Sequence, residues 1–476
     1  MSTAVDHRIS ARRVQRAADG LGPFARAGII GLGTIAGEML IPQQPQAADA
    51  MRNPAVVLAF AMLLIPAVDA GMLGVRSALK IRNILLLGLV YWLLVDLIQG
   101  LYPIEASTAA IETAFEAVGL FAAGISIGGG LLLGGLPTRL KQMVRADLND
   151  RQILILASFC FIIGIFYYVY MASFSLPLIL GGLFDRGRFE APWARGALGD
   201  WHSFLEQLIY FGYLLPPLTA VIFIQNRRWF NVKTIYCLVL SGCFLVFPVQ
   251  TGARTTIGAV LGSSILAGVL ISRRSLRSIH IVAAVAVVFV VQVAMNIILE
   301  NRNSGLGNIE VQDWTFSRIR VDDNFNRLAQ TADFVPTSYP YSGLQFVYVS
   351  LVRPIPRALW PGKPVYQGFT VEEAVGGGAS LTSSVVGEAY AGWGFPLVFA
   401  MGMFFGVAAR WWEQTLEDRP TSGGVLVYAF GTMALFCALR GFVNIILISY
   451  PILSLWGAAA LFRFVRQRRT PRRGSV

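Results

Sequence analysis

The dominant pattern along the chain is a succession of long apolar runs separated by short polar segments. A helix needs about 20 mostly apolar residues to cross the hydrocarbon core of a bilayer. Hydrocarbon offers no partner to free backbone amides, so runs that cross it must be helical. The runs of sufficient length are residues 22–41, 54–74, 83–101, 113–136, 152–172, 204–224, 234–250, 255–272, 279–299, 390–409, 423–439 and 443–462. The pattern predicts an all-α polytopic membrane protein with about twelve transmembrane helices.

The composition agrees with a chain that is dissolved in lipid. Of the 476 residues, 55% are hydrophobic and 14% are charged, and the mean hydropathy is +0.60. Soluble domains carry about 25% charged residues. These values exclude a disordered chain, a nucleic-acid-binding domain and an ordinary soluble enzyme.

The chain has a net charge of +12, and its basic residues form short clusters between the apolar runs. This distribution indicates how the chain is oriented in the membrane. Lysine and arginine concentrate in alternate loops. The short loops of the other set contain almost none, namely Arg52, Arg254 and Arg440. Cytoplasmic loops are enriched in lysine and arginine. The sequence therefore predicts that both termini lie in the cytoplasm.

This orientation predicts how the chain is organised. Two long segments fall on the outer, periplasmic face, at 173–203 and 300–389, and long loops on a rigid scaffold commonly carry function. The second lies between spans nine and ten, and residues 346–360 can form an interfacial helix that Pro354 and Pro356 would interrupt. The expected parts are a basic cytoplasmic tail at 1–21, a nine-span bundle at 22–299, the loop 300–389, a three-span bundle at 390–462, and a basic cytoplasmic tail at 463–476.

Arg254 is the first candidate for chemistry. It follows a tight outer hairpin and opens the next span, with the hydroxyls of Thr251, Thr255 and Thr256 beside it. A helix N-terminus attracts anions, so a lipid pyrophosphate is one candidate ligand. The alternative is an arginine that extends toward the lipid headgroups. Both interpretations stay open at this point.

A second basic group lies in the long outer loop. Arg353 and Arg357 are four residues apart and would share one face of a helix, and Lys363 follows them. Arginine suits phosphate because its planar group binds two oxygens at once. The alternative is a basic collar that contacts lipid phosphates. Arg440, alone in the last outer hairpin, is a further candidate for an anion site.

Acidic residues at the outer face and within the spans are further candidates for function. Glu388, at the outer start of a span, is a candidate base for a sugar hydroxyl, with a helix N-terminal role as the alternative. Acidic residues within membrane spans commonly have a function, because burying their charge in lipid is costly. Asp96 lies near the end of its span, which favours a structural role. A mixed stretch of the long loop is expected to be a solvated face, and it contains Arg318, Arg320, Asp322, Asp323 and Arg327.

The sequence gives no sign of a metal or cofactor site. It contains no HExxH, GxSxG or P-loop motif. The four cysteines lie in apolar runs and form no CxxC pair, which argues against a zinc site and a disulfide framework. We therefore expect neither a metal nor a cofactor.

Three short motifs resemble a known family. They are PRALWPGKP at 356–364, GEAYAGWG at 387–394 and GAR at 252–254. Together with the long late outer loop, they resemble the oligosaccharide repeat-unit polymerases, the Wzy-type O-antigen and exopolysaccharide polymerases. The close motifs cover a small part of the chain, and the remaining likeness is one of layout and composition.

The resemblance implies a metal-independent, inverting glycosyltransferase of the GT-C superfamily in the bacterial inner membrane. Such an enzyme moves a glycan from its polyprenyl pyrophosphate carrier onto another lipid-linked repeat unit at the periplasmic face. Carried over to this chain, Arg254 and Arg357 would hold the pyrophosphate, with Arg353, Lys363 and Arg440 as neighbours. Trp360 and Tyr390 are further substrate-binding candidates, with interfacial anchoring as the alternative. A flippase and a chain-length regulator are the implied protein partners.

Three other functions stay open. An O-antigen ligase-like transferase shares the layout, although ligases commonly use a histidine in the long loop, and residues 300–389 contain none. A lipid-linked oligosaccharide flippase or transporter suits twelve spans, but the sequence has no midplane charge cluster or matching halves. The third is a structural membrane subunit without chemistry.

Overall fold

The computed structural model is helical, as the apolar runs predict. It describes residues 20–131, 134–194, 205–226, 230–272, 278–301, 303, 306–307, 318–355, 357, 359–366, 368–375, 383–416 and 421–469. These ranges contain no β-strand. Residues 1–19 and 470–476, which make up most of the two basic tails, lie outside the described residues.

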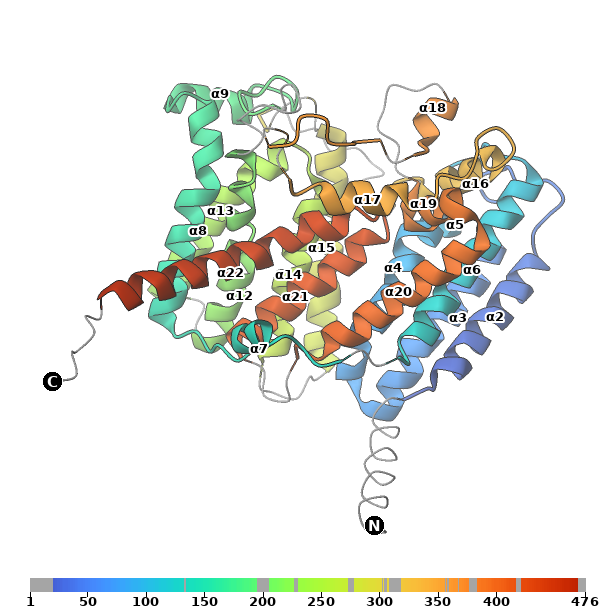
Figure 1. The fold of residues 1–476 in the computed structure, drawn as a ribbon, viewed down its shortest axis with the longest axis horizontal. Coiled ribbons are helices and arrows are strands. Elements are labelled where there is room, and N and C mark those ends of the chain that lie inside the picture. The colour runs from blue at the N-terminus through green and yellow to red at the C-terminus, as the bar shows by residue number, and fades with distance from the viewer. Residues whose placement is uncertain are drawn as a thin grey trace, which may run out of the picture.

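The first half of the chain contains α2 to α12 (Figure 1). The elements are α2 (Pro23–Glu38), α3 (Arg52–Leu73), the 3-10 turn η1 (Val75–Leu79), α4 (Ile81–Leu89), the π-helical turn η2 (Val90–Leu94), α5 (Val95–Gln99), α6 (Thr108–Gly128), α7 (Thr138–Val144), α8 (Asp150–Met171), α9 (Leu176–Phe184), α11 (Ile209–Gly212) and α12 (Leu215–Asn226).

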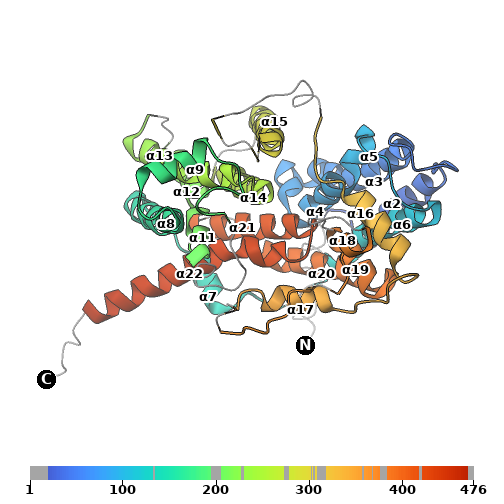
Figure 2. The same cartoon turned by 90° about the horizontal axis from the view of Figure 1, so that it is seen from above.

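The second half contains α13 to α22. Its helices are α13 (Val232–Gln250), α14 (Arg254–Ile271), α15 (Ser278–Asn301), α16 (Asn324–Phe334), α17 (Gln345–Val352), α18 (Val371–Val375), α19 (Ser384–Trp393), α20 (Phe395–Glu413), α21 (Ser422–Ala438) and α22 (Asn444–Arg469). Viewed from above, α20 and α21 occupy the middle, with α8 and α12–α14 on one side and α2, α3, α5 and α6 on the other, and α22 extends outward past α8 (Figure 2).

Eight helical stretches among the described residues are long and apolar enough to cross a membrane: Arg52–Leu73, Ile81–Gln99, Thr108–Gly128, Asp150–Met171, Ile209–Asn226, Val232–Gln250, Arg254–Ile271 and Phe395–Glu413. Large apolar side chains on their outer faces are exposed, such as Phe60 at 66% and Leu238 at 60%. In water such surfaces would be a liability, whereas lipid accepts them. The chain is therefore a helical polytopic membrane protein.

The other four apolar runs also overlap helices. The helices concerned are α2, with 16 residues, and the apolar stretches of 10–17 residues at Ala286–Asn301, Ser422–Ala438 and Asn444–Ser454. The three stretches belong to α15, α21 and α22. Each of the twelve runs identified in the sequence therefore coincides, at least in part, with a helix.

One expected boundary is wrong. The span expected at 390–409 is divided, because α19 ends at Trp393 and α20 begins at Phe395. Gly394 between them has φ of +65°, a left-handed conformation that glycine adopts without the steric cost of a side chain. Pro396 then lies in the first turn of α20, where its missing amide costs nothing. The membrane helix accordingly begins at Phe395.

Glycines allow α6 and α20 to approach closely. A Cβ on Gly128 would lie 2.2 Å from the Met403 carbonyl oxygen, and one on Gly406 would lie 2.2 Å from the Ile125 carbonyl oxygen. Gly124 on α6 and Gly402 on α20 are similarly confined by backbone atoms of the other helix. Small residues four apart are a common means of packing membrane helices backbone to backbone. This contact joins the early and late parts of the chain.

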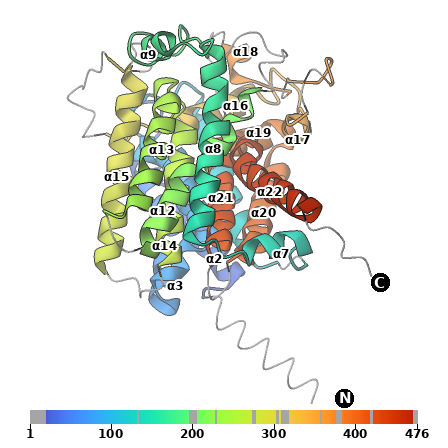
Figure 3. The same ribbon diagram turned by 90° about the vertical axis from the view of Figure 1, so that its left-hand side faces the viewer.

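Connections from the more basic loop set meet at one end of the bundle, where α7 lies (Figure 3). The Arg76 guanidinium donates a hydrogen bond to the Ser272 carbonyl oxygen over 2.9 Å. The Leu148 amide donates to the Ser422 hydroxyl over 2.6 Å. All four residues belong to the loop set that the sequence assigns to the cytoplasm.

Connections from the other loop set meet at the opposite end, near α9, α16 and α18 (Figure 3). The Trp193 indole donates to the Gln250 amide oxygen over 3.0 Å. The Ser107 hydroxyl donates to the Asp333 carboxylate over 2.5 Å. Segments 173–203 and 300–389, both expected on the outer side, therefore contribute to the same end of the molecule.

Candidate anion-binding site

Arg254 is positioned by the hairpin between α13 and α14. Gly252 has φ of +66°, and the Ala253 amide donates back to the Pro248 carbonyl oxygen over 3.1 Å. This reversal makes Arg254 the first residue of α14. Its Nη2 lies 2.8 Å from Oδ1 of Asp322, and its side chain is 19% exposed.

Arg440 reaches the same carboxylate from another part of the bundle. It lies in the turn after α21, and its Nε is 2.6 Å from Oδ2 of Asp322. Its Nη1 donates to the Thr255 hydroxyl over 3.0 Å. Two arginines therefore form ion pairs with the two oxygens of one aspartate, of which only the Arg254 contact is also a hydrogen bond. A threonine from the first turn of α14 adjoins them. The three charged side chains carry a net charge of +1.

Asp322 is fixed from behind by Asp96 on α5. The Asp96 carboxylate accepts the amides of Val321, Asp322 and Asp323 over 3.3, 3.4 and 3.1 Å. Beside it, the Gln99 side chain exchanges two hydrogen bonds with the backbone of Ile319, of 2.9 and 2.8 Å. Residues 319–323 are thus attached along the end of α5.

This arrangement corrects the expectation that Asp322 and Asp323 form a solvated face. Asp322 is 23% exposed and pairs with two arginines, and Asp323 is 25% exposed and lies 3.5 Å from Arg327. Burial raises the pKa of the Asp323 carboxyl to about 6, while a hydrogen bond from Asn326 and the charge of Arg327 act in the opposite direction. For Asp322 the expectation fails because its partners Arg254 and Arg440 lie far away in the sequence. For Asp323 it fails because the side chain is largely buried, although its partner Arg327 is only four residues away.

Asp322 and Asp96 are the residues of this cluster that the sequence did not identify as site residues, whereas Thr255 was expected beside Arg254. Asp96 was expected to have a structural role, and its hydrogen bonds to the loop agree with one. The sequence showed Asp322 only as an acidic residue near arginines of the same outer loop. That pattern does not reveal that its partners are Arg254 and Arg440.

Glu388 lies inside the bundle beside the turn that carries Arg440. It is 6% exposed, and its Oε2 accepts the Phe442 amide over 2.7 Å. Burial raises the pKa of the Glu388 carboxyl to about 8, and the hydrogen bond from Phe442 acts in the opposite direction. Glu388 therefore holds the 439–443 turn through one backbone amide, instead of capping its own helix.

Arg353, Arg357 and Lys363 form a separate basic group after α17. The Lys363 ammonium donates to the carbonyl oxygens of Arg353 and Ile355 over 3.1 and 2.7 Å, so it closes this loop. Partial burial lowers the pKa of Lys363, and the charges of Arg353 and Arg357 act in the same direction. Arg357 is half-buried and Arg353 is exposed.

The link between the two basic groups is apolar. Phe346 on α17 packs edge-on against Phe442, with ring centroids 5.7 Å apart. Phe442 belongs to the turn that carries Arg440. The structure thus brings Arg254 and Arg440 together directly, whereas Arg357 lies beyond the far end of α17.

The two aromatic candidates differ in burial. Tyr390 on α19 is 8% exposed and packs edge-on against Phe395, with ring centroids 5.7 Å apart. Its ring therefore belongs to the core. Trp360, in the basic loop, is half-buried and keeps part of its surface accessible.

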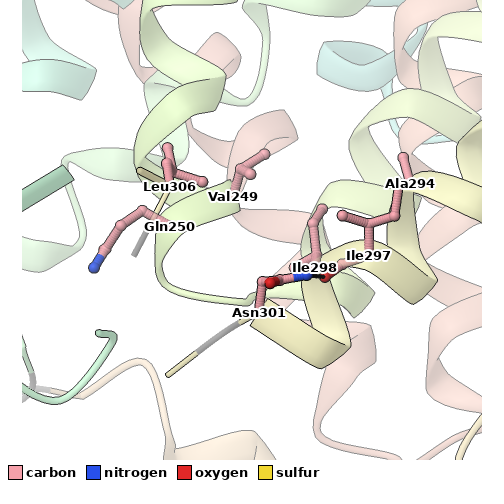
Figure 4. Close-up of a pocket in the computed structure, with 7 residues that line it drawn as sticks. All are labelled: Val249, Gln250, Ala294, Ile297, Ile298, Asn301 and Leu306. Carbon is pink, nitrogen blue, oxygen red and sulfur yellow. Dashed lines mark hydrogen bonds between the residues drawn. The ribbon is translucent and has the colours of Figure 1, made fainter. Parts of the chain in front are cut away.

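An apolar pocket of about 240 Å³ lies next to the Arg254 hairpin (Figure 4). Its lining comes from the end of α13, the end of α15 and one loop residue: Val249, Gln250, Ala294, Ile297, Ile298, Asn301 and Leu306. Ile298 also packs with Ile257, one turn into α14. The pocket thus adjoins the helix that begins with Arg254.

No group of three or more His, Cys, Asp or Glu side chains in the described part of the chain is arranged to hold a metal ion. The Arg254–Arg440 cluster presents two guanidinium groups and a hydroxyl, which are donors that suit an anion.

Comparison with known proteins gives one match. Residues 233–446 match a family described as "Domain of unknown function (DUF8712)". This range contains Arg254, Asp322, Glu388 and Arg440 but not Asp96. No curated protein matches the chain, and no solved structure matches it.

Proposed function

We propose that this protein is a polysaccharide polymerase of the bacterial inner membrane. It transfers a glycan from a polyprenyl pyrophosphate carrier onto a second lipid-linked repeat unit at the periplasmic face. The observation that carries the proposal is the convergence of Arg254 and Arg440 on one carboxylate, next to the Thr255 hydroxyl. Two converging guanidinium groups suit a diphosphate, which offers oxygens to both.

The proposed topology has twelve crossings with both termini in the cytoplasm and a long periplasmic loop between spans nine and ten. Its support is the pairing of connections: Arg76 contacts Ser272 at one end, and Trp193 contacts Gln250 at the other. Each contact joins loops that the positive-inside rule assigns to the same side. On this topology, the Arg254–Arg440 cluster faces the periplasm.

The proposed reaction is one direct displacement. The acceptor hydroxyl oxygen attacks the anomeric carbon, and the bond from that carbon to the diphosphate oxygen breaks. The bonding electrons leave with the diphosphate, the hydroxyl proton passes to a base, and the configuration inverts. Negative charge accumulates on the departing oxygen, so fixed guanidinium groups stabilise the transition state more than the ground state.

Glu388 has two assignable roles in this proposal. The sequence assigns it as the base, but a carboxyl whose pKa is about 8 keeps its proton at neutral pH, and only its minor ionised form could accept one. Its burial and its bond to the Phe442 amide favour a positioning role, in which it holds the turn of Arg440. We favour the positioning role, and water at the outer face then takes the proton.

The remaining candidates are assigned to the same substrate. Arg353, Arg357 and Lys363 form a second basic surface for carrier phosphates, with Trp360 beside it as a stacking face for a sugar. The apolar pocket between α13 and α15 adjoins the first turn of α14, which suits the first prenyl units behind the diphosphate. The donor and acceptor lipids are the substrates, and a flippase and a chain-length regulator are the proposed protein partners.

The test is a gene deletion followed by gel analysis of surface polysaccharide. Loss of long chains with retention of single repeats on the anchor supports the polymerase. Total loss of surface sugar supports a flippase or transporter, and accumulation of unattached lipid-linked polymer supports a ligase. Complementation with Arg254→Ala should leave single repeats only, whereas Arg52→Ala, which removes another outer arginine, should restore long chains. Normal polymer from Arg254→Ala would contradict the proposal.

A further inference from the structure

We infer that Asp322 is an internal latch that occupies the anion site until the substrate diphosphate displaces it. The inference rests on the proposed function, because it concerns the regulation of that same site. Asp322 belongs to the long loop and contributes no charge that would attract an anion. Its carboxylate lies where an anionic ligand of Arg254 and Arg440 would lie, with Oδ1 2.8 Å from the first and Oδ2 2.6 Å from the second.

The charge balance favours exchange of Asp322 for a diphosphate. A single carboxylate leaves a net charge of +1 on the two arginines and presents two oxygens. A diphosphate carries more negative charge and more acceptor oxygens, and it can also accept a hydrogen bond from the Thr255 hydroxyl. Arginine binds phosphate and carboxylate through the same planar donor geometry. A diphosphate would therefore compete with Asp322 for the Arg254 Nη2 donor, and it could also use the Arg440 Nε, which is close to Asp322 but makes no hydrogen bond.

The hydrogen bonds that attach the backbone around Asp322 to Asp96 are long. The three hydrogen bonds from residues 321–323 to Asp96 measure 3.3, 3.4 and 3.1 Å, and two of them exceed the usual range of about 2.7–3.2 Å. Asp323 has φ of +31°, a left-handed conformation that is unfavourable for a residue with a side chain. Residues 321–323 are thus held by long bonds, whereas Ile319 is anchored by two bonds of ordinary length from Gln99. Asp323 in addition has an unfavourable backbone conformation just before α16 begins.

The competing explanation is that Asp322 permanently orients the two arginines. The two explanations make opposite predictions for removal of the carboxylate. A latch lowers the affinity for diphosphate, so its removal raises that affinity. A permanent orienting group preorganises the arginines, so its removal weakens binding.

The test measures binding of farnesyl diphosphate to the purified full-length protein in nanodiscs by titration calorimetry. Asp322→Asn should bind it about tenfold more tightly than the natural protein, which corresponds to about 1.4 kcal/mol. Asp323→Asn is the matched control: it removes the same charge one residue away and should change binding less than threefold. Arg254→Ala should abolish binding. Weaker binding by Asp322→Asn, or an equal gain by Asp323→Asn, would overturn the latch.

If Asp322→Asn misfolds, a second variant and a second measurement still test the latch. Asp96→Asn keeps the Asp322 charge but loosens its attachment, and it should also tighten binding. Hydrogen exchange of amides 321–323 in the natural protein should accelerate when farnesyl diphosphate is added. Unchanged or slower exchange would contradict the latch.

The outcomes separate the latch from the polymerase. If the folded natural protein and Asp322→Asn both fail to bind farnesyl diphosphate, the latch is wrong. If binding follows the predicted order while deletion of the gene leaves polysaccharide length unchanged, the latch is supported and the polymerase assignment fails.

Discussion

Arg254 and Arg440, at the start of α14 and after the end of α21, bind opposite oxygens of the Asp322 carboxylate. Arg440 also donates a hydrogen bond to the Thr255 hydroxyl over 3.0 Å. Two tight turns of a membrane bundle and one long loop thereby form a single cluster. This relationship is the basis for assigning the cluster to a diphosphate.

The proposed role of the arginines depends on their planar donor groups and not on charge alone. Arg254→Lys and Arg440→Lys keep the charge but lose the two-oxygen geometry. We expect each variant to make about tenfold to 100-fold less long-chain polymer than the natural protein, since a hydrogen bond to a charged group contributes about 1.5–3 kcal/mol. Gel analysis of complemented deletion strains measures this. Full polymer length from both lysine variants would contradict the role.

The two roles of Glu388 are separated by Glu388→Gln and Glu388→Ala. Glutamine keeps an oxygen that can accept the Phe442 amide, but it cannot take a proton. If Glu388 positions the Arg440 turn, Glu388→Gln retains most of the polymer and Glu388→Ala loses it, with a stability cost of about 1–3 kcal/mol for the unsatisfied amide. Polymer length and thermal unfolding in detergent report the two effects. Loss of polymer from a stable Glu388→Gln would instead assign Glu388 as the base.

The raised pKa of Glu388 predicts a pH-dependent stability. The folded protein retains this proton up to about pH 8, whereas the unfolded chain releases it near the usual value of 4.5. The stability contribution is therefore complete below pH 4.5 and is lost as the pH rises to about 8, with a slope of up to about 1.4 kcal/mol per pH unit.

Comparison with Glu388→Gln isolates this effect. The pKa of Asp323 is raised only to about 6, so unfolding between pH 6.5 and pH 8 responds mainly to Glu388. Over that range the unfolding temperature of the natural protein should fall more steeply than that of Glu388→Gln. Parallel curves would show that Glu388 is ionised in the folded state.

The contact between α6 and α20 depends on the absence of side chains at its glycines. A Cβ at Gly406 would lie 2.2 Å from the Ile125 carbonyl oxygen, so Gly406→Ala should destabilise the bundle by about 1–3 kcal/mol. Gly242→Ala is the matched control on α13, because a Cβ there meets nothing within 4 Å. Thermal unfolding in detergent should distinguish the two variants, and equal stability would show that α6 and α20 are not in such close contact.

The proposed orientation predicts which loops a membrane-impermeant maleimide reaches. Ser338 and Arg139 are both exposed and belong to the outer and inner loop sets. In a Cys243→Ser background, Ser338→Cys should be labelled in intact spheroplasts and Arg139→Cys only after the membrane is permeabilised. Labelling in the reverse order would invert the topology and move the Arg254–Arg440 cluster to the cytoplasmic side.

The sequence by itself determined the helical membrane architecture, because hydrocarbon admits only apolar runs of sufficient length with satisfied backbones. It also identified Arg254 as a helix-opening arginine, since a hairpin is a local feature. The break at Gly394 was missed, because the apolar pattern continues across it while the helix is interrupted there. Only the tertiary structure decided that Asp322 pairs with Arg254 and Arg440 and that Glu388 holds the turn at Phe442. These contacts join residues distant in the chain, and apolar periodicity carries no information about which buried charges meet.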